Sequence, residues 1–229
     1  FGISGYELMT RAAESVYAAA TARWPDARRW VVICGAGNNG GDGYVTARLA
    51  RQRGHDVRVC ALVDPVKLAG DAATAWQDFA TAGGTLQPFA PDLLADAELI
   101  IDALLGTGLA RPVTGEFRAA IDAVNAAGRP VVAVDIPSGL DASTGHPAGA
   151  AVRADLTVTF VGRKLGLYLG DGPDYTGQLH FAGLGIPPEV VDRAGLGGKE
   201  SLRLFTMAEL PRLLPRRAAT AHKGRFGHV

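Results

Sequence analysis

Polar side chains that could do chemistry follow each of four apolar, strand-like runs in this sequence. In chain order they are Asn38, Asn39 and Asp42 after residues 30–33, Asp102 after 99–101, Asp135 and Ser138 after 131–134, and Lys164 after 156–160. Carboxylates, amides, a hydroxyl and an amine can transfer protons and can bind a polar ligand or a cation. Four ordinary turns would carry fewer such groups, so this pattern favours one shared site.

The spacing Gly35-x-Gly37-x-x-Gly40 matches a dinucleotide-binding fingerprint, with Asp64 as a candidate ribose-binding acid. The N–H groups of a glycine turn and the positive end of the next helix bind polar ligands. Asp42 weakens the match, because its carboxylate would lie beside the bound phosphates, and like charges in contact repel by about 1 kcal/mol even in water. An ordinary redox dehydrogenase is therefore disfavoured. The structural alternative for Asp42 is a helix cap.

Asn39, Asp102 and Ser138 form a candidate cation site. They offer oxygen ligands, which suit a hard ion, and the absence of His and Cys from these turns disfavours zinc and iron. One carboxylate among neutral oxygens favours a monovalent ion over calcium or magnesium. The alternative is that these three residues cap the backbone of their turns.

Alternating strands and helices would bring these residues to one edge of a sheet. The expected helices cover a stretch from the Ser4–Glu7 capping box to Pro25, then residues 44–51, the stretch between 64 and 82, and 116–125. The expected strands are 30–33, 55–63, 99–101, 131–134, 156–160 and 178–181. Near-continuous apolar strands alternating with helices predict a parallel sheet covered on both faces, with ligands beyond the carboxyl ends of the strands.

Composition bounds the class of protein. The 229 residues are 48% hydrophobic, with 23 Lys plus Arg against 23 Asp plus Glu, as expected for one soluble α/β domain. A neutral balance argues against a nucleic-acid or membrane partner. No bilayer-spanning run and no signal-peptide pattern is found, so a cytoplasmic location is expected. Cys34 and Cys60 lie in apolar runs, which predicts buried free thiols.

Four motifs in this order resemble the NAD(P)H-hydrate epimerase family, that is, the YjeF amino-terminal domain family. They are Gly35-Ala36-Gly37-Asn38-Asn39-Gly40-Gly41-Asp42-Gly43, Ile101-Asp102-Ala103-Leu104-Leu105-Gly106-Thr107-Gly108, Val134-Asp135-Ile136-Pro137-Ser138-Gly139-Leu140-Asp141 and Lys164-Leu165-Gly166. The resemblance runs from about residue 2 to about residue 186. It implies an α/β fold, a Rossmann-like three-layer αβα sandwich with a mostly parallel central sheet. It also implies an isomerase for nicotinamide nucleotide repair, which interconverts the R and S forms of C6-hydrated NADH and NADPH (NADHX and NADPHX) without redox chemistry.

The resemblance also implies site residues and a potassium ion. The substrate-binding residues would be Asn38, Asn39, Gly40, Gly41, Asp42, Gly106, Thr107, Gly108, Leu109, Ala110, Arg111, Pro112 and Asp135. The potassium ligands would be Asn39, Asp102 and Ser138, the same three residues as the candidate cation site. A homodimer, formed through the first helix, is a further expectation.

Acid/base chemistry is assigned to Asp135, with Lys164 orienting the substrate or steadying charge. The C6 hydrate is a hemiaminal, so inverting C6 breaks and remakes a bond to that carbon, by loss of the hydroxyl or by ring opening at N1. Both routes need proton transfer. Burial at a strand end would favour the neutral form of Asp135. The alternatives are that Asp135 only hydrogen-bonds its turn and that Lys164 is a solvated loop cation.

The last part of the sequence has a different character. Residues 1–205 are assigned to the epimerase domain, with 202–205 as an edge strand or linker. Residues 206–229 resemble a linker and the truncated beginning of a fused, nucleotide-dependent hydrate dehydratase domain, too short for dehydratase activity, the alternative being a flexible basic tail. Two other functional classes stay open, a non-catalytic Rossmann-like interaction module and a dinucleotide-binding oxidoreductase.

Overall fold

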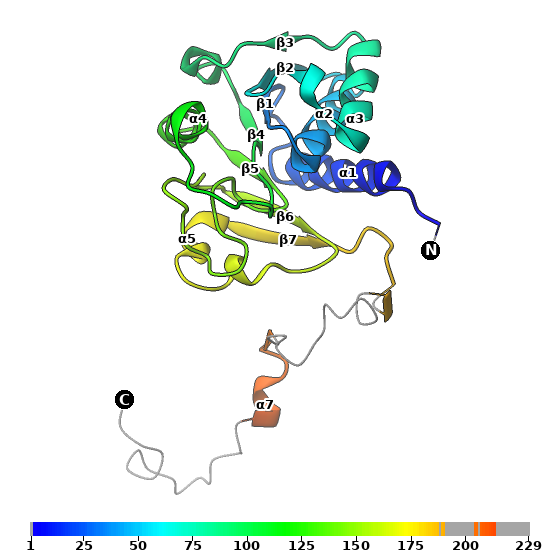
Figure 1. Ribbon diagram of the computed structural model, residues 1–229. Coiled ribbons are helices and arrows are strands. Elements are labelled where there is room, and N and C mark those ends of the chain that lie inside the picture. Colours follow the sequence, from blue (N-terminus) through cyan, green and yellow to red (C-terminus); the bar gives the residue numbers. More distant parts are fainter. Residues whose placement is uncertain (1, 188, 191–203, 206, 214–229) are drawn as a thin grey trace, which may run out of the picture.

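The centre of the fold is a parallel sheet of seven strands in the order β3-β2-β1-β4-β5-β6-β7, as a computed structural model shows (Figure 1). The structure describes residues 2–187, 189–190, 204–205 and 207–213. The strands are β1 Arg29–Cys34, β2 Asp56–Ala61, β3 Leu86–Gln87, β4 Leu99–Ala103, β5 Val131–Val134, β6 Leu156–Phe160 and β7 Gln178–Ala182. The order reverses between β1 and β4, and ligands of open parallel sheets bind beyond the carboxyl ends of the strands at such a point.

Helices cover both faces of the sheet (Figure 1). On one face lie α1 Gly5–Arg23, α2 Asn38–Gln52 and α3 Gly70–Thr81. On the other face lie α4 Gly115–Ala126 and the short 3-10 helix η2 Pro91–Leu94. The remaining short elements are η1 Pro65–Lys67, η3 Leu165–Leu167, α5 Gly172–Thr176 and α7 Leu210–Leu213. The three-layer α/β fold expected from the sequence is confirmed.

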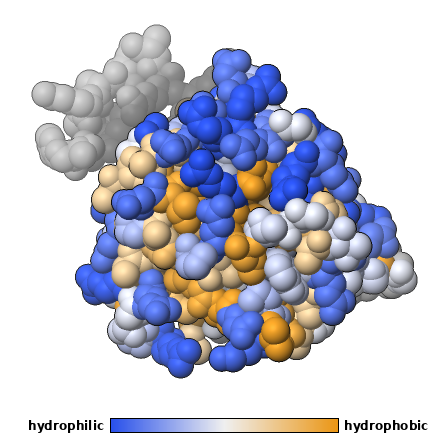
Figure 2. Space-filling model, turned by 90° about the horizontal axis from the view of Figure 1, so that it is seen from above, coloured by the Kyte–Doolittle hydropathy of each residue, from blue (hydrophilic) through white to orange (hydrophobic). Residues whose placement is uncertain are grey.

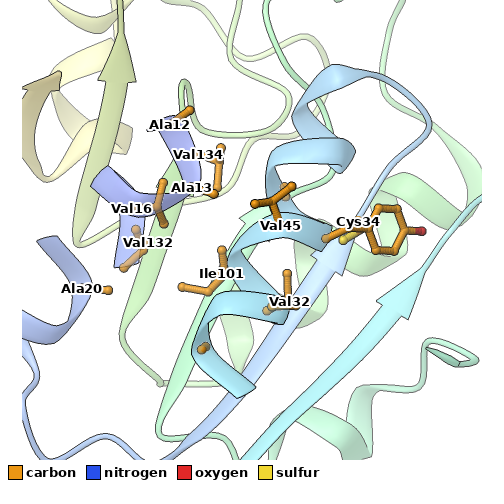
Figure 3. Packing of buried hydrophobic residues seen from close by; sticks show 14 of the residues in the cluster. Ala12, Ala13, Val16, Ala20, Val32, Cys34, Val45, Ile101, Val132 and Val134 are labelled. Atoms are coloured by element: carbon orange, nitrogen blue, oxygen red, sulfur yellow. The ribbon is translucent and has the colours of Figure 1, made fainter. Parts of the chain in front are cut away.

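The core between the helices and the sheet is made of small and β-branched side chains. Ala13, Val16 and Ala20 on α1 face Val132 and Val134 on β5, as Figure 3 shows from close by. Val45 on α2 faces Val32 of β1 in the same cluster. Small residues on α1 bring this helix close to the sheet. Cys34 and Cys60 are buried free thiols, as predicted.

Several predicted boundaries differ from the structure. The helix expected from residue 44 begins at Asn38, so most of the glycine turn lies inside α2. The single helix expected between 64 and 82 is broken: the Asp64 side chain accepts from the Val66 N–H at 3.0 Å, and Leu68 and Ala69 are extended before α3. The strand predicted over 55–63 covers Asp56–Ala61. The elements β3, η2, η3 and α5 were not predicted.

The N-terminal cap was predicted correctly. Ser4 Oγ accepts a hydrogen bond from the Glu7 N–H at 3.1 Å, and α1 ends at Arg23, before Pro25. Leu204 and Phe205, from the predicted edge strand or linker, lie in no strand, and residues 202–203 and 214–229 lie outside the described part of the chain.

The surface at the β3 edge of the sheet mixes hydrophobic and hydrophilic residues. Hydrophobic side chains lie in the middle of the face shown in Figure 2, and charged or polar side chains surround and interrupt them. None of the described helices has the length and apolar character needed to cross a membrane.

Candidate functional site

Asp102 and Ser138 form a buried polar pair beside the point where the strand order reverses. Both residues are 0% exposed. Asp102 lies inside β4, one residue before its end, and its Oδ1 accepts from Ser138 Oγ at 2.5 Å while its Oδ2 accepts from the Ser138 N–H at 2.8 Å. Burial raises the pKa of Asp102 to about 6, although the hydrogen bonds from Ser138 act in the opposite direction.

Asn39 joins this pair through the Leu105 peptide group. Asn39 Nδ2 donates to Leu105 O at 3.1 Å, and the Leu105 N–H donates to Ser138 Oγ at 2.8 Å. Asn39 Oδ1 is buried and has no hydrogen-bond donor in the described part of the chain. The structure therefore links all three predicted cation ligands through the Leu105 peptide and Ser138, and the Asn39 amide oxygen stays unpaired among the described residues.

This donor set fits a monovalent hard cation. Among the described residues, no group of three or more His, Cys, Asp or Glu could hold a metal ion, so any cation here would meet one carboxylate and neutral oxygens. A buried oxygen without a donor costs about 1–3 kcal/mol, and a cation would remove that cost.

Asp135 stands at a strained turn just after β5. Its φ is +68°, and the Ile136 N–H donates to Val134 O at 2.8 Å, which closes a γ-turn of the rarer, positive-φ type. A second such turn follows β6, where Val161 has φ +61° and the Gly162 N–H donates to Phe160 O at 2.6 Å. Strained turns cluster at functional sites, and this pair directs the chain from both strand ends toward one place.

Asp135 and Lys164 form an ion pair between these two turns. Lys164 Nζ donates to Asp135 Oδ1, to Thr159 Oγ1 at 3.2 Å and to Phe160 O at 3.0 Å. The Phe160 N–H also donates to Asp135 Oδ1 at 3.1 Å. The two side chains are only 17% and 18% exposed. These contacts fix the position of the Asp135 carboxyl between the ends of β5 and β6.

Asp42 is the third charged group in this part of the molecule. It lies in the second turn of α2 and is partly buried. Burial raises its pKa well above the usual range, the charge of Asp135 raises it further, and Lys164 acts in the opposite direction. Asp42 does not cap the helix, because the N-cap is Gly37 and no side chain caps this end. The structural alternative considered for Asp42 is thus wrong.

The glycines of the first motif let α2 begin close to the sheet. A Cβ at Gly40 would lie 2.2 Å from Gly35 O, and one at Gly35 would lie 1.8 Å from Leu104 O. A Cβ at Gly37, by contrast, would meet nothing within 4 Å, so the space in front of the helix is open. The free N–H groups of Asn38 and Asn39 at this helix end can bind an anion such as a phosphate.

The predicted segment from Gly106 to Pro112 lies partly at this edge. A Cβ at Gly106 would lie 3.2 Å from Asn39 Cβ, so the segment starts beside the candidate cation site. Thr107, Gly108, Ala110 and Arg111 are exposed, and Leu109 packs against the second core cluster. This part of the predicted site is an exposed loop.

Two site groups were not predicted from the sequence. Thr159 donates to Asp135 Oδ1 at 3.3 Å and accepts from Lys164, and the Leu105 peptide joins Asn39 to Ser138. The sequence carries a signal for Thr159, because a polar residue in a strand that is buried at every position needs a partner. It carries none for a backbone group such as Leu105.

Fold and site together define an open parallel α/β protein with a polar, carboxylate-containing site at the carboxyl edge of its sheet. Similarity to known protein families refines this class. Residues 5–166 match the model for the family described as YjeF-related protein N-terminus, and the chain belongs to that family.

Three similar proteins are named for NAD(P)H-hydrate repair or epimerisation. The chain is 44% identical to the bifunctional NAD(P)H-hydrate repair enzyme Nnr of Coxiella burnetii, with 100% of this chain and 46% of that protein covered. It is 42% identical to the Escherichia coli protein of the same name, covering 100% of this chain and 43% of that protein. It thus spans about half the length of these relatives. It is also 43% identical to the NAD(P)H-hydrate epimerase of Limosilactobacillus fermentum, with 79% of this chain and 86% of that protein covered.

A solved structure supports the fold. The crystal structure of yeast ynu0 superposes with a TM-score of 0.72 at 21% identity, over 85% of each chain.

Proposed function

We propose that this chain epimerises the R and S forms of C6-hydrated NADH and NADPH by acid/base chemistry, as an isomerase of nicotinamide nucleotide repair. The observation that carries the proposal is the Asp135–Lys164 pair, a carboxylate held by an ammonium group at the ligand-binding edge of the sheet. The names of the relatives give the substrate class.

Each residue at the carboxyl edge of the sheet has a proposed role that follows from its chemistry. The open N-terminus of α2 at Asn38 would receive a phosphate of the nucleotide. Asn39, Gly40, Gly41 and Asp42 and the loop from Gly106 to Pro112 would line the rest of the nucleotide, with the reacting C6 near Asp135. Asp135 would take up and return the proton, and Lys164 would hold the Asp135 carboxyl in place through their ion pair.

Potassium would be held by Asn39, Asp102 and Ser138. The unpaired Asn39 Oδ1 and the buried Asp102 carboxylate are the features that support it. A bound potassium ion would supply fixed positive charge that balances the ionised Asp102 and orders the Leu105 peptide.

The proposal also covers the location of the protein, its oligomeric state and its second domain. We place it in a cytoplasmic homodimer that contacts through α1. The chain would form the epimerase half of a protein whose other half is a hydrate dehydratase, with the division near residue 205, because the bifunctional relatives are about twice as long.

One experiment tests the activity directly. The protein is mixed with one purified hydrate epimer, without any redox partner, and the other epimer is followed by NMR. We expect the mixture to reach equilibrium faster than the same solution without protein, and Asp135→Asn to remove the acceleration while the fold persists. A wild-type protein that leaves the uncatalysed rate unchanged would sink the proposal, and cofactor oxidation would favour an oxidoreductase.

A further inference from the structure

Thr159 is a buried threonine whose hydroxyl contacts both charged groups of the Asp135–Lys164 pair. Its side chain is 0% exposed and belongs to β6, a strand that is buried at every position. Its Oγ1 lies 3.3 Å from Asp135 Oδ1 and 3.2 Å from Lys164 Nζ. An ammonium group can only donate hydrogen bonds, so the hydroxyl accepts from Lys164 and directs its own hydrogen at Asp135.

The sheet itself brings Thr159 beside Asp135. The strands β5 and β6 are parallel, and their register pairs Val134 with Val158. The Asp135 N–H continues this ladder by donating to Val158 O at 2.8 Å, so the next residue of β6, Thr159, lies beside Asp135. The contact between the two side chains is therefore set by two strands of the core.

The contacts of the Asp135 carboxyl are gathered on one of its two oxygens. Lys164 Nζ, the Phe160 N–H and Thr159 Oγ1 all donate to Oδ1. No hydrogen bond to Oδ2 is found among the described residues, and Oδ2 is not one of the buried atoms without a partner, so it stays accessible. Because both oxygens are bonded to one carbon atom, holding Oδ1 also limits where Oδ2 can point.

We propose that Thr159 is a positioning residue for Asp135, whose hydroxyl holds Oδ1 at the end of β6 and leaves Oδ2 to exchange the proton with the substrate. This inference rests on the proposed function and adds to it a residue that does not touch the nucleotide. A side chain that is 0% exposed cannot reach a ligand, so Thr159 acts through Asp135. Misplacing a reacting group by about 1 Å can cost about a hundredfold in rate.

The test replaces Thr159 with valine, which has a similar shape but no hydroxyl. We expect kcat for epimerisation to fall about tenfold while KM changes by less than about threefold, because the substrate loses no contact. Thr159→Ser, which restores the hydroxyl, should return kcat to within about threefold of the wild-type value. Serine is smaller than valine, so repair by serine is a result that packing alone would not give.

Thr157→Val is the matched control. Thr157 lies two residues earlier on the same face of β6 and is also 0% exposed, but its hydroxyl donates to Thr176 O at 2.7 Å, outside the Asp135–Lys164 pair. Both valine variants lose a buried hydrogen bond, so the midpoint of urea unfolding should fall in both. We expect kcat of Thr157→Val to stay within about twofold of the wild-type value.

A second variant serves if Thr159→Val does not fold. Thr159→Cys carries a thiol, which is only a weak hydrogen-bond donor, so its kcat should be lower than that of Thr159→Ser. Equal kcat values for the cysteine and serine variants would overturn the role of Thr159.

The outcomes separate this inference from the proposed function. An active wild type whose Thr159→Val variant keeps kcat within about twofold, or loses no more than Thr157→Val does, overturns the role of Thr159 alone. A wild-type protein without epimerase activity overturns the proposed function instead.

Discussion

Lys164 uses all three of its N–H donors on the protein. Its ammonium group bonds Asp135, Thr159 Oγ1 and Phe160 O, so contact with a substrate would cost one of these bonds. We therefore expect Lys164 to position the Asp135 carboxyl and not to contact the substrate itself. The sequence predicted proton transfer by Asp135 and a role for Lys164 in orienting the substrate or steadying charge. It did not show that the two residues are paired, because the pairing depends on the γ-turns after β5 and β6.

Replacing Lys164 with Met should damage both stability and activity. The variant leaves the Asp135 carboxylate, which is 18% exposed, without its cation. Breaking a buried ion pair in this way costs about 3 kcal/mol of stability, and solvent screening of the partly exposed carboxylate lowers this cost. We expect a lower midpoint in urea unfolding and a lower kcat. Lys67→Met, at an exposed position of η1, is the control. Near-normal turnover in Lys164→Met would contradict the positioning role.

The buried Asp102 predicts a pH-dependent stability. Its pKa is raised from the ordinary value to about 6, so the folded state binds a proton more tightly than the unfolded state, and stability falls as the pH rises from about 4 to about 6. A shift of about two units corresponds to about 3 kcal/mol. In choline chloride, Asp102→Asn should lack this fall, as measured by urea unfolding across that pH range.

Potassium should restore the stability that the wild-type protein loses when Asp102 ionises. Binding to the ionised Asp102 stabilises the folded state, so potassium chloride should raise the melting temperature at pH 7.5 relative to choline chloride at equal ionic strength. Asp102→Asn should not respond. An equal response of both proteins would count against a cation site at Asp102.

At the scale of the elements, the start of α2 shows what the sequence could not reveal. Residues 38–43 are Asn and Gly with one Asp, and each Gly in a helix costs about 1 kcal/mol relative to Ala, so propensity favours a turn. Tertiary packing overrides it: a Cβ at Gly43 would lie 2.6 Å from Ala103 Cβ, and one at Gly41 would lie 2.5 Å from Met9 Cε. The central strands β1, β4, β5 and β6, by contrast, were predictable, because their apolar runs are buried at nearly every position; the two-residue β3 was not.

Gly40→Ala tests this packing of α2. Alanine improves helix propensity by about 1 kcal/mol, but its Cβ would lie 2.2 Å from Gly35 O, a backbone atom that moves only with its loop. We expect the clash to outweigh the gain in helix propensity, so that the free energy of unfolding falls by about 2 kcal/mol. Gly108→Ala, where a Cβ meets nothing within 4 Å, should be neutral or slightly stabilising in the same urea titration. Equal effects of the two substitutions would contradict this account.

At the scale of the whole molecule, the α1 surface opposite the sheet is the candidate contact between two copies of the chain. A shallow surface depression there is lined by Glu14, Tyr17, Ala18, Thr21, Ala22 and Arg53. Ala18 and Ala22 are exposed and small, so a second helix could approach closely.

Ala18→Arg should therefore separate the proposed dimer. A long cation in the middle of a helix contact would be desolvated without a partner. We expect light scattering to give twice the chain mass for the wild type and the chain mass for Ala18→Arg. Ala126→Arg, at an exposed position of α4, is the control and should remain dimeric. A monomeric wild type, or a dimeric Ala18→Arg, would remove α1 from the interface.

The γ-turn at Asp135 has a consequence for how this fold can diverge. With φ +68°, the position accepts few residues without strain, and Asn and Gly are the ones that tolerate it best. Mutational drift there would retain folded proteins mainly when Asp is replaced by one of these two, and both lack the carboxyl group. The backbone would thus preserve the architecture while the proposed reaction is lost, so a single substitution at this position could separate folding from the proposed activity.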